Sequence, residues 1–101
     1  MKFGLTEETV KKIVGVFSNY PQIKEVKLLG SRAKGNYRNG SDIDLTLLGD
    51  HLNQSDIGRI ANSLDELMLP YSFDISIYKQ LTNEDFIDHI DRIGVTFYKK
   101  E

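Results

Sequence analysis

Two aspartates separated by a single residue, Asp42 and Asp44, are the side chains with the clearest capacity for chemistry in this chain. In an extended segment, side chains two positions apart lie on the same face, about 6.6 Å apart along the strand. Carboxylate oxygens are the ligands that magnesium and other hard divalent cations prefer. The pattern therefore predicts a divalent-cation site at the start of a strand.

A glycine-serine pair precedes these aspartates at the end of a short apolar run. Gly30 and Ser31 are followed by a polar segment with further glycines. A turn of this kind offers backbone N–H groups and a hydroxyl to phosphate oxygens. Arg32, which adjoins the turn, and Ser41, which precedes the first aspartate, are further candidates for contact with a nucleotide. We expect residues 30 to 44 to hold a nucleoside triphosphate together with its metal.

A third aspartate, Asp74, lies in a later segment in which Phe73, Ile75 and Ile77 alternate with polar side chains. If the two aspartate-bearing strands are neighbours, all three carboxylates cluster and repel one another. Two magnesium ions about 3.5–4 Å apart would relieve this repulsion and bind a triphosphate. Asp74 is also placed to accept a proton from an incoming hydroxyl. The chemistry indicated is nucleotidyl transfer, in which a hydroxyl attacks the α-phosphorus and pyrophosphate leaves.

The apolar spacing along the chain predicts helices and strands that position these residues. Thr6 is the expected N-cap of the first helix, and Asn53 or Ser55 is the expected N-cap of the second. Thr82 or Asn83 is expected to cap the last helix, and Gly94 is expected to end it as a C′ residue. The predicted order is a helix that stops at residues 19–21, a strand over 23–29, a loop over 32–41 with a short helical turn after Ser31, a strand over 42–48, a helix carrying 57–68, a strand over 72–78, a helix carrying 86–93 and a terminal strand over 95–98.

The strands over 42–48 and 72–78 share one property. Each has an apolar face and places aspartate on the other face. This predicts an α/β (α+β) fold with a mixed sheet, helices packed on one face and carboxylates on the open face. A length of 101 residues fits a single domain, residues 1–101.

The composition excludes several classes of function. The chain has no cysteine, which excludes disulfides, thiolate nucleophiles and thiolate-bound zinc. A net charge of −2 argues against direct binding of nucleic acid. The sequence has neither a membrane-length apolar run nor a signal peptide, so we expect a cytoplasmic protein with no membrane partner. A Walker A site is excluded because Asn36 and Tyr37 stand where lysine and serine or threonine are required.

The motif resembles the signature of the DNA polymerase β-like nucleotidyltransferase superfamily, and above all its smallest branch, the minimal nucleotidyltransferases. The residues that carry the resemblance are Gly30-Ser31, Gly35, Ser41-Asp42-Ile43-Asp44-Leu45 and Asp74. The element order fits as well, so the resemblance extends over nearly the whole chain and implies the polymerase β-like fold. It implies that Asp42 and Asp44 bind Mg²⁺, that Asp74 completes the catalytic and metal site, and that Gly30 and Ser31 bind the triphosphate of ATP.

The resemblance also implies a partner. Minimal nucleotidyltransferases are commonly paired with a HEPN-domain toxin, and members of the family act as antitoxins by transferring AMP to a tyrosine of the toxin. The expected assembly is therefore a hetero-oligomer with such a toxin. Two alternatives stay open: a binding subunit that neutralises its partner by contact alone, and a nucleotidyltransferase acting on a small molecule of the aminoglycoside kind.

Overall fold

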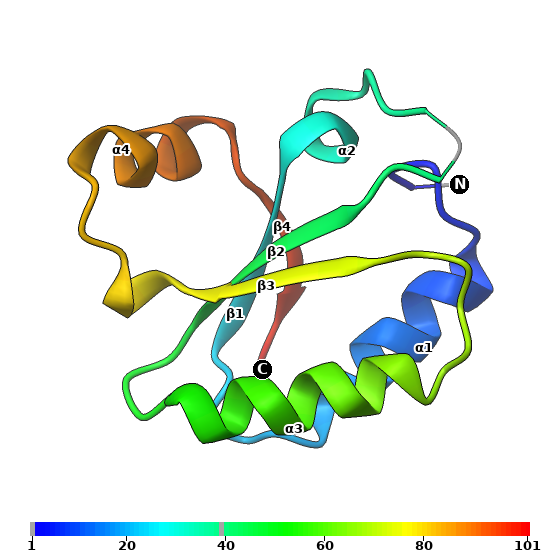
Figure 1. The fold of residues 1–101 in the computed structure, drawn as a ribbon, viewed down its shortest axis with the longest axis horizontal. Coiled ribbons are helices and arrows are strands. Elements are labelled where there is room, and N and C mark those ends of the chain that lie inside the picture. The colour runs from blue at the N-terminus through cyan, green and yellow to red at the C-terminus, as the bar shows by residue number, and fades with distance from the viewer. Residues whose placement is uncertain (1, 39) are drawn as a thin grey trace.

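A mixed sheet of four strands runs through the centre of the molecule (Figure 1). The computed structural model describes residues 2–38 and 40–101, so Asn39 of the expected loop lies outside the described residues. The strands are β1 (Glu25–Leu29), β2 (Ile43–Leu48), β3 (Phe73–Ile77) and β4 (Val95–Lys99). They lie in the order β3-β2-β1-β4. Strand β1 pairs antiparallel with β2 and β4, whereas β2 and β3 are parallel, so the expected mixed sheet is confirmed.

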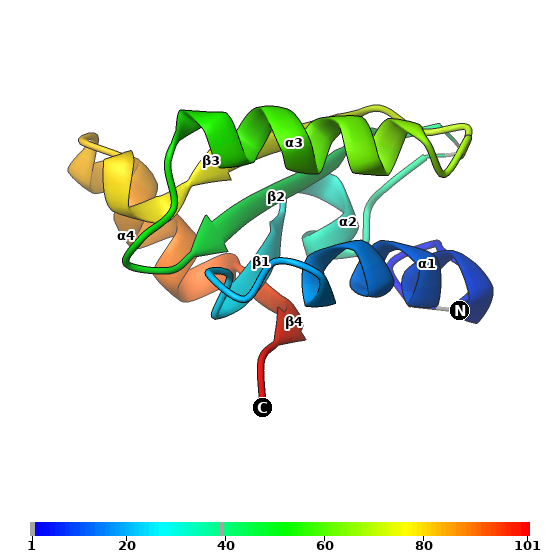
Figure 2. The same cartoon turned by 90° about the horizontal axis from the view of Figure 1, so that it is seen from below.

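Helices connect the strands and lie on both sides of the sheet. They are α1 (Glu7–Ser18), α2 (Gly30–Lys34), α3 (Gln54–Asp65) and α4 (Glu84–Ile93), with a short 3₁₀ turn η1 (Tyr78–Gln80). The two longest, α1 and α3, pack together on one face, as Figures 1 and 2 show. Helices α2 and α4 lie on the other side of the sheet. The predicted coverage of one face thus holds for the long helices, while α2 and α4 pack on the carboxylate face against β1.

The core lies between the sheet and the pair α1 and α3. Strand β2 contributes three residues that are at most 1% exposed, Ile43, Leu45 and Leu47. Helices α1 and α3 contribute Phe17 and Ile60, which are fully buried. Since side chains alternate along a strand, burial of the odd-numbered residues of β2 directs its even-numbered residues to the opposite face. The core therefore determines which face carries the aspartates.

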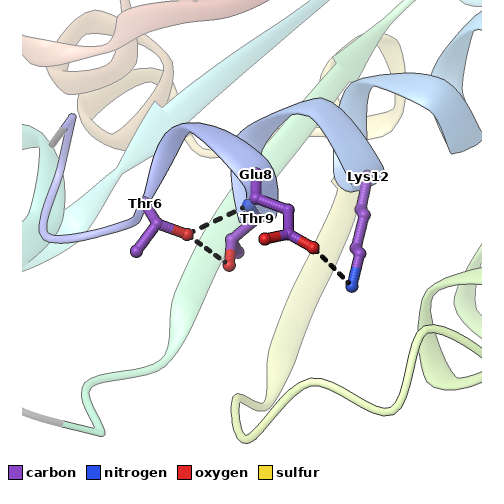
Figure 3. A network of polar contacts seen from close by, with 4 residues as sticks. All are labelled: Thr6, Glu8, Thr9 and Lys12. Carbon is purple, nitrogen blue, oxygen red and sulfur yellow. Dashed lines mark hydrogen bonds and ion pairs between the residues drawn. The ribbon is translucent and has the colours of Figure 1, made fainter.

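The first helix begins where the sequence predicts. The hydroxyl of Thr6 accepts a hydrogen bond from the backbone N–H of Thr9 (3.1 Å) and donates one to the Thr9 hydroxyl (3.0 Å), as Figure 3 shows. One turn later, Glu8 and Lys12 form an exposed ion pair at 3.5 Å. Such exposed pairs contribute little, about 0.3–0.5 kcal/mol. The cap rather than the ion pair thus fixes where α1 begins.

The structure decides the open choices of cap. Asn53, not Ser55, caps α3, and Asn83, not Thr82, caps α4. Gly94 ends α4, but with φ −60° rather than in the left-handed conformation expected of a C′ glycine. Glycine is needed there for space, because a Cβ would lie 2.6 Å from the carbonyl oxygen of Ile90. Among the described residues, no helix is long and apolar enough to cross a bilayer.

Asp56 ties the start of α3 to the rest of the molecule. Its side chain is 6% exposed and accepts two hydrogen bonds, from the Asn53 backbone N–H (3.0 Å) and from the Gln22 side chain (3.0 Å). We predict that Asp56→Ala lowers the free energy of unfolding by about 1–3 kcal/mol, because it leaves both donors without a partner. Urea denaturation measures the change. Asp65→Ala, at the exposed end of the same helix, is the matched control and should stay within about 0.5 kcal/mol of wild type. Equal losses in the two variants would contradict the assignment.

Candidate active site

Asp44 and Asp74 lie side by side on the face of the sheet opposite the core. The parallel register of β2 and β3 pairs these two residues directly. Both line a cavity of about 350 Å³, together with Gly30 from the start of α2. The expectation that the two aspartate-bearing strands are neighbours is confirmed. Asp44 is half-buried and Asp74 is exposed.

Asp42 completes an electrostatic group with these two aspartates. It is exposed and precedes β2 by one residue, so the strand starts one position later than predicted. The pKa of Asp44 is raised, first by partial burial and then by the negative charges of Asp74 and Asp42. Within residues 2–38 and 40–101, no group of three or more His, Cys, Asp or Glu side chains is arranged to hold a metal ion. The three carboxylates therefore interact through charge without forming a ready-made ligand cage.

Gly30 is in direct contact with the carboxylate of Asp44. Its φ is +72°, a backbone conformation that side chains disfavour, and a Cβ at this position would lie 2.5 Å from Oδ2 of Asp44. Glycine is thus required both for conformation and for space. Gly30 is also the first residue of α2, and the first N–H groups of a helix have no partner within it. Ser31 is half-buried in the same turn. Gly30 of the predicted turn therefore lies against the carboxylate of Asp44, whereas Ser31 is not among the residues that line the cavity.

Arg32 is placed differently from the other predicted site residues. Its side chain is 3% exposed, and its guanidinium lies between the rings of Tyr37 and Tyr71, 5.5 and 4.9 Å from their centroids. It donates two hydrogen bonds to the carbonyl of Ser41 (3.1 and 2.8 Å) and one to the carbonyl of Phe3 (2.8 Å). These contacts indicate that Arg32 holds the loop before β2 rather than the phosphates.

Ser41 also acts within this loop. Its hydroxyl accepts a hydrogen bond from the backbone N–H of Arg38 (2.8 Å), and its own N–H donates to the Arg38 carbonyl (3.0 Å). Its carbonyl is the acceptor for Arg32. Ser41 thus fixes the backbone immediately before Asp42, which supports the site from outside the cavity.

Two residues of the cavity were not predicted from the sequence. Phe86 and His89, both on α4, line the same cavity as the carboxylates. The sequence pattern assigns Phe86 to the apolar stripe of the last helix and His89 to the surface. In the structure, Ile90 is the fully buried residue of that helix, whereas Phe86 is 40% exposed. The spacing of Phe86 and His89 in the sequence could have indicated that they share one surface, since positions three apart on a helix lie on one side.

The family comparison identifies the protein class to which this arrangement belongs. The family model described as Polymerase beta, Nucleotidyltransferase matches residues 11–101, which include the three aspartates. The chain belongs to this nucleotidyltransferase family. No curated protein matches the chain significantly.

Solved structures share the fold of this nucleotidyltransferase at low sequence identity. A crystal structure of a toxin-antitoxin with AMP-PNP gives a TM-score of 0.71 at 20% identity, covering 96% of this chain and 76% of that chain. The crystal structure of the toxin-antitoxin MntA-HepT gives a TM-score of 0.67 at 18% identity, covering 94% of this chain and 74% of that chain. A third structure is the tri-AMPylated Shewanella oneidensis HEPN toxin in complex with MNT antitoxin. It gives a TM-score of 0.68 at 17% identity, covering 95% of this chain and 74% of that chain. These similarities show a common fold.

The contact between Gly30 and Asp44 can be tested against a glycine of similar conformation. Gly35 has φ +87°, but nothing lies within 4 Å of a Cβ built there. We predict that Gly35→Ala lowers the free energy of unfolding by about 1–2 kcal/mol, the cost of the left-handed conformation alone. Gly30→Ala should cost more, because it also displaces the Asp44 carboxylate. Urea denaturation of both variants measures the difference, and equal losses would show that the Asp44 contact has no energetic consequence.

The raised pKa of Asp44 gives stability a definite dependence on pH. The carboxyl proton of Asp44 is bound more tightly in the folded protein than in the unfolded chain, so the ionised form of Asp44 destabilises the fold above the raised pKa. Protonation of Asp44 removes this destabilisation as the pH falls through the raised pKa. We predict that Asp44→Asn raises the melting temperature at pH 7 in metal-free buffer, and that the gain shrinks as the buffer is acidified. Differential scanning calorimetry across pH provides the measurement.

Asp50→Asn is the control for this pH series. A hydrogen bond from Lys24 lowers the pKa of Asp50, so its ionised form is the one that the fold favours. Asp50→Asn should therefore not raise the melting temperature at pH 7. A gain of similar size in both variants would mean that overall charge, rather than the repulsion at Asp44, is responsible.

Proposed function

We propose that this protein is a magnesium-dependent nucleotidyltransferase that transfers AMP from ATP to a tyrosine of a HEPN-domain toxin and thereby acts as its antitoxin. The observation that carries the proposal is the pairing of Asp44 with Asp74 beside Gly30, with Asp42 close enough to affect the pKa of Asp44. Membership of the nucleotidyltransferase family supports the class of reaction.

The donor set fits magnesium. Asp42, Asp44 and Asp74 offer only carboxylate oxygens, and the raised pKa of Asp44 reflects a repulsion that a cation would relieve. When bound, magnesium would neutralise phosphate charge and lower the pKa of an attacking hydroxyl. We assign the metal to Asp42 and Asp44, with Asp74 completing the site.

The remaining steps fall to residues of the chain itself. The N–H groups at the start of α2 and the hydroxyl of Ser31 bind the triphosphate, beside the carboxylate of Asp44. Asp74 is exposed and lines the cavity, so it accepts the proton of the incoming hydroxyl. The oxygen of that hydroxyl forms a bond to the α-phosphorus, and the bond to the departing pyrophosphate breaks.

A protein acceptor is consistent with the exposure of the site. Asp42 and Asp74 are both exposed, so a hydroxyl on a macromolecule can reach the carboxylates. The structures with the same fold include toxin-antitoxin complexes, one of them with a tri-AMPylated HEPN toxin and an MNT antitoxin. Together with the motif resemblance, these complexes support a HEPN-domain protein as the partner.

Mass measurement of the partner tests the proposal directly. We predict that a HEPN-domain toxin encoded beside this chain gains one or more AMP units when incubated with the protein, ATP and magnesium. The double variant Asp42→Asn with Asp44→Asn should give no gain, because the metal ligands are lost. Asp50→Asn, an exposed aspartate outside the cavity, should behave as wild type. If wild type neutralises the toxin without any mass gain, neutralisation occurs by contact alone and the proposed transfer is wrong.

A further inference from the structure

We propose that Phe86 and His89 form an aromatic wall that binds the nucleobase of the triphosphate. The inference rests on the proposed function and assigns a specificity-determining role to two residues outside the sequence motif. Both residues line the cavity that also contains Gly30, Asp44 and Asp74. The metal-binding side and the aromatic wall are therefore parts of one continuous cavity.

Helix α4 is held in a fixed position on the sheet, so the aromatic wall is preorganised. Ile90 is fully buried, and a Cβ at Gly94 would lie 3.3 Å from the Leu29 side chain, which places the end of α4 against β1. The hydroxyl of Tyr78 donates a hydrogen bond to Asp91 (2.8 Å), which ties the helix to the end of β3. The Asn83 side chain caps the helix by accepting from the N–H of Phe86 (3.0 Å). These anchors fix the backbone that carries the wall.

The two side chains suit a planar ring. Phe86 is 40% exposed although it is strongly apolar, and His89 is half-buried one helical turn away. Residues three apart on a helix are neighbours, and both side chains line the same cavity. Stacking of a base on such side chains is favourable and tolerates different bases, because every base has an aromatic face.

The charge of the cavity favours a base at the aromatic wall over a phosphate. Among the described residues that line the cavity there is no lysine or arginine, while Asp44 and Asp74 contribute negative charge. A phosphate at the wall would meet two nearby aspartates and, among these described lining residues, no lysine or arginine, whereas an uncharged ring needs no cationic partner. The triphosphate thus belongs at the metal and the start of α2, and the base at α4. The tyrosine ring of the acceptor is the competing occupant, which the experiment separates.

The test compares ATP with inorganic tripolyphosphate, which has the phosphates but no base. Isothermal titration calorimetry with magnesium gives the affinity of each ligand. We predict that Phe86→Ala weakens ATP binding about 5- to 20-fold and leaves tripolyphosphate binding within about 2-fold of wild type. His89→Ala should likewise weaken ATP binding and leave tripolyphosphate binding nearly unchanged. Phe86→Tyr should keep the wild-type preference for ATP. Ile93→Ala removes another partly exposed apolar side chain of α4 that does not line the cavity, and should alter neither affinity.

The outcomes separate failure of the inference from failure of the proposed function. If wild type binds neither ligand, the proposed function fails and the inference fails with it. If wild type binds both and Phe86→Ala leaves the ratio of the two affinities unchanged, only the inference is wrong. If Phe86→Ala keeps its ATP affinity but no longer supports AMP transfer to the partner, the wall contacts the acceptor instead, and the assignment to the nucleobase is overturned.

Discussion

The parallel register of β2 and β3 is the constraint on which the site depends. It pairs Asp44 with Asp74 and leaves Ile43 and Leu45 of β2 on the buried face. A shift of β2 by one residue would turn Asp44 into the core and an isoleucine or leucine into the cavity. Burying an unpaired carboxylate is costly, and so is exposing the core. Hydrophobic packing on one face thus enforces the juxtaposition of charges on the other, although no favourable interaction between the carboxylates holds them together.

The site itself works against stability. Like charges surround Asp44 and raise its pKa, and Gly30 adopts a left-handed conformation in contact with the same carboxylate. Under the proposed function each feature would have a chemical use, since the repulsion would favour a bound cation and the absence of a Cβ would let the backbone approach a phosphate. Burial of apolar side chains in the core between the sheet and the pair α1 and α3 offsets the free-energy cost of these two features. Such opposition between stability and activity is common at functional sites.

The sequence predicted the parts of the fold that depend on local pattern. Alternation of apolar and polar side chains in β2 and β3 and the cap at Thr6 follow from residues close in the chain. Both are found, although Thr46, on the carboxylate face of β2, is fully buried. The contacts of Arg32 could not be predicted from local pattern because they are distant in sequence: the carbonyl of Phe3 is 29 residues away. An arginine beside a glycine-serine turn suggests a phosphate ligand, and only the folded loop shows that its hydrogen bonds go to the backbone. The position of Phe86 in the cavity could not be predicted for a related reason. An apolar residue in a helix is expected to be buried in the core, and only the packing of α4 shows that Phe86 is exposed.

The arrangement of helices limits how an acceptor approaches. Helices α1 and α3 cover the face opposite the carboxylates, and α2 and α4 stand on the carboxylate side (Figures 1 and 2). Under the proposed function, an incoming hydroxyl would therefore reach Asp74 from the side of the sheet that carries α2 and α4. Because Asp42 and Asp74 are exposed, water has the same access as the acceptor. Closing a site against water strengthens its electrostatic interactions and suppresses hydrolysis. Under the proposed function, a protein acceptor that covers this opening would perform both tasks at once and so would contribute to catalysis as well as receive the AMP group.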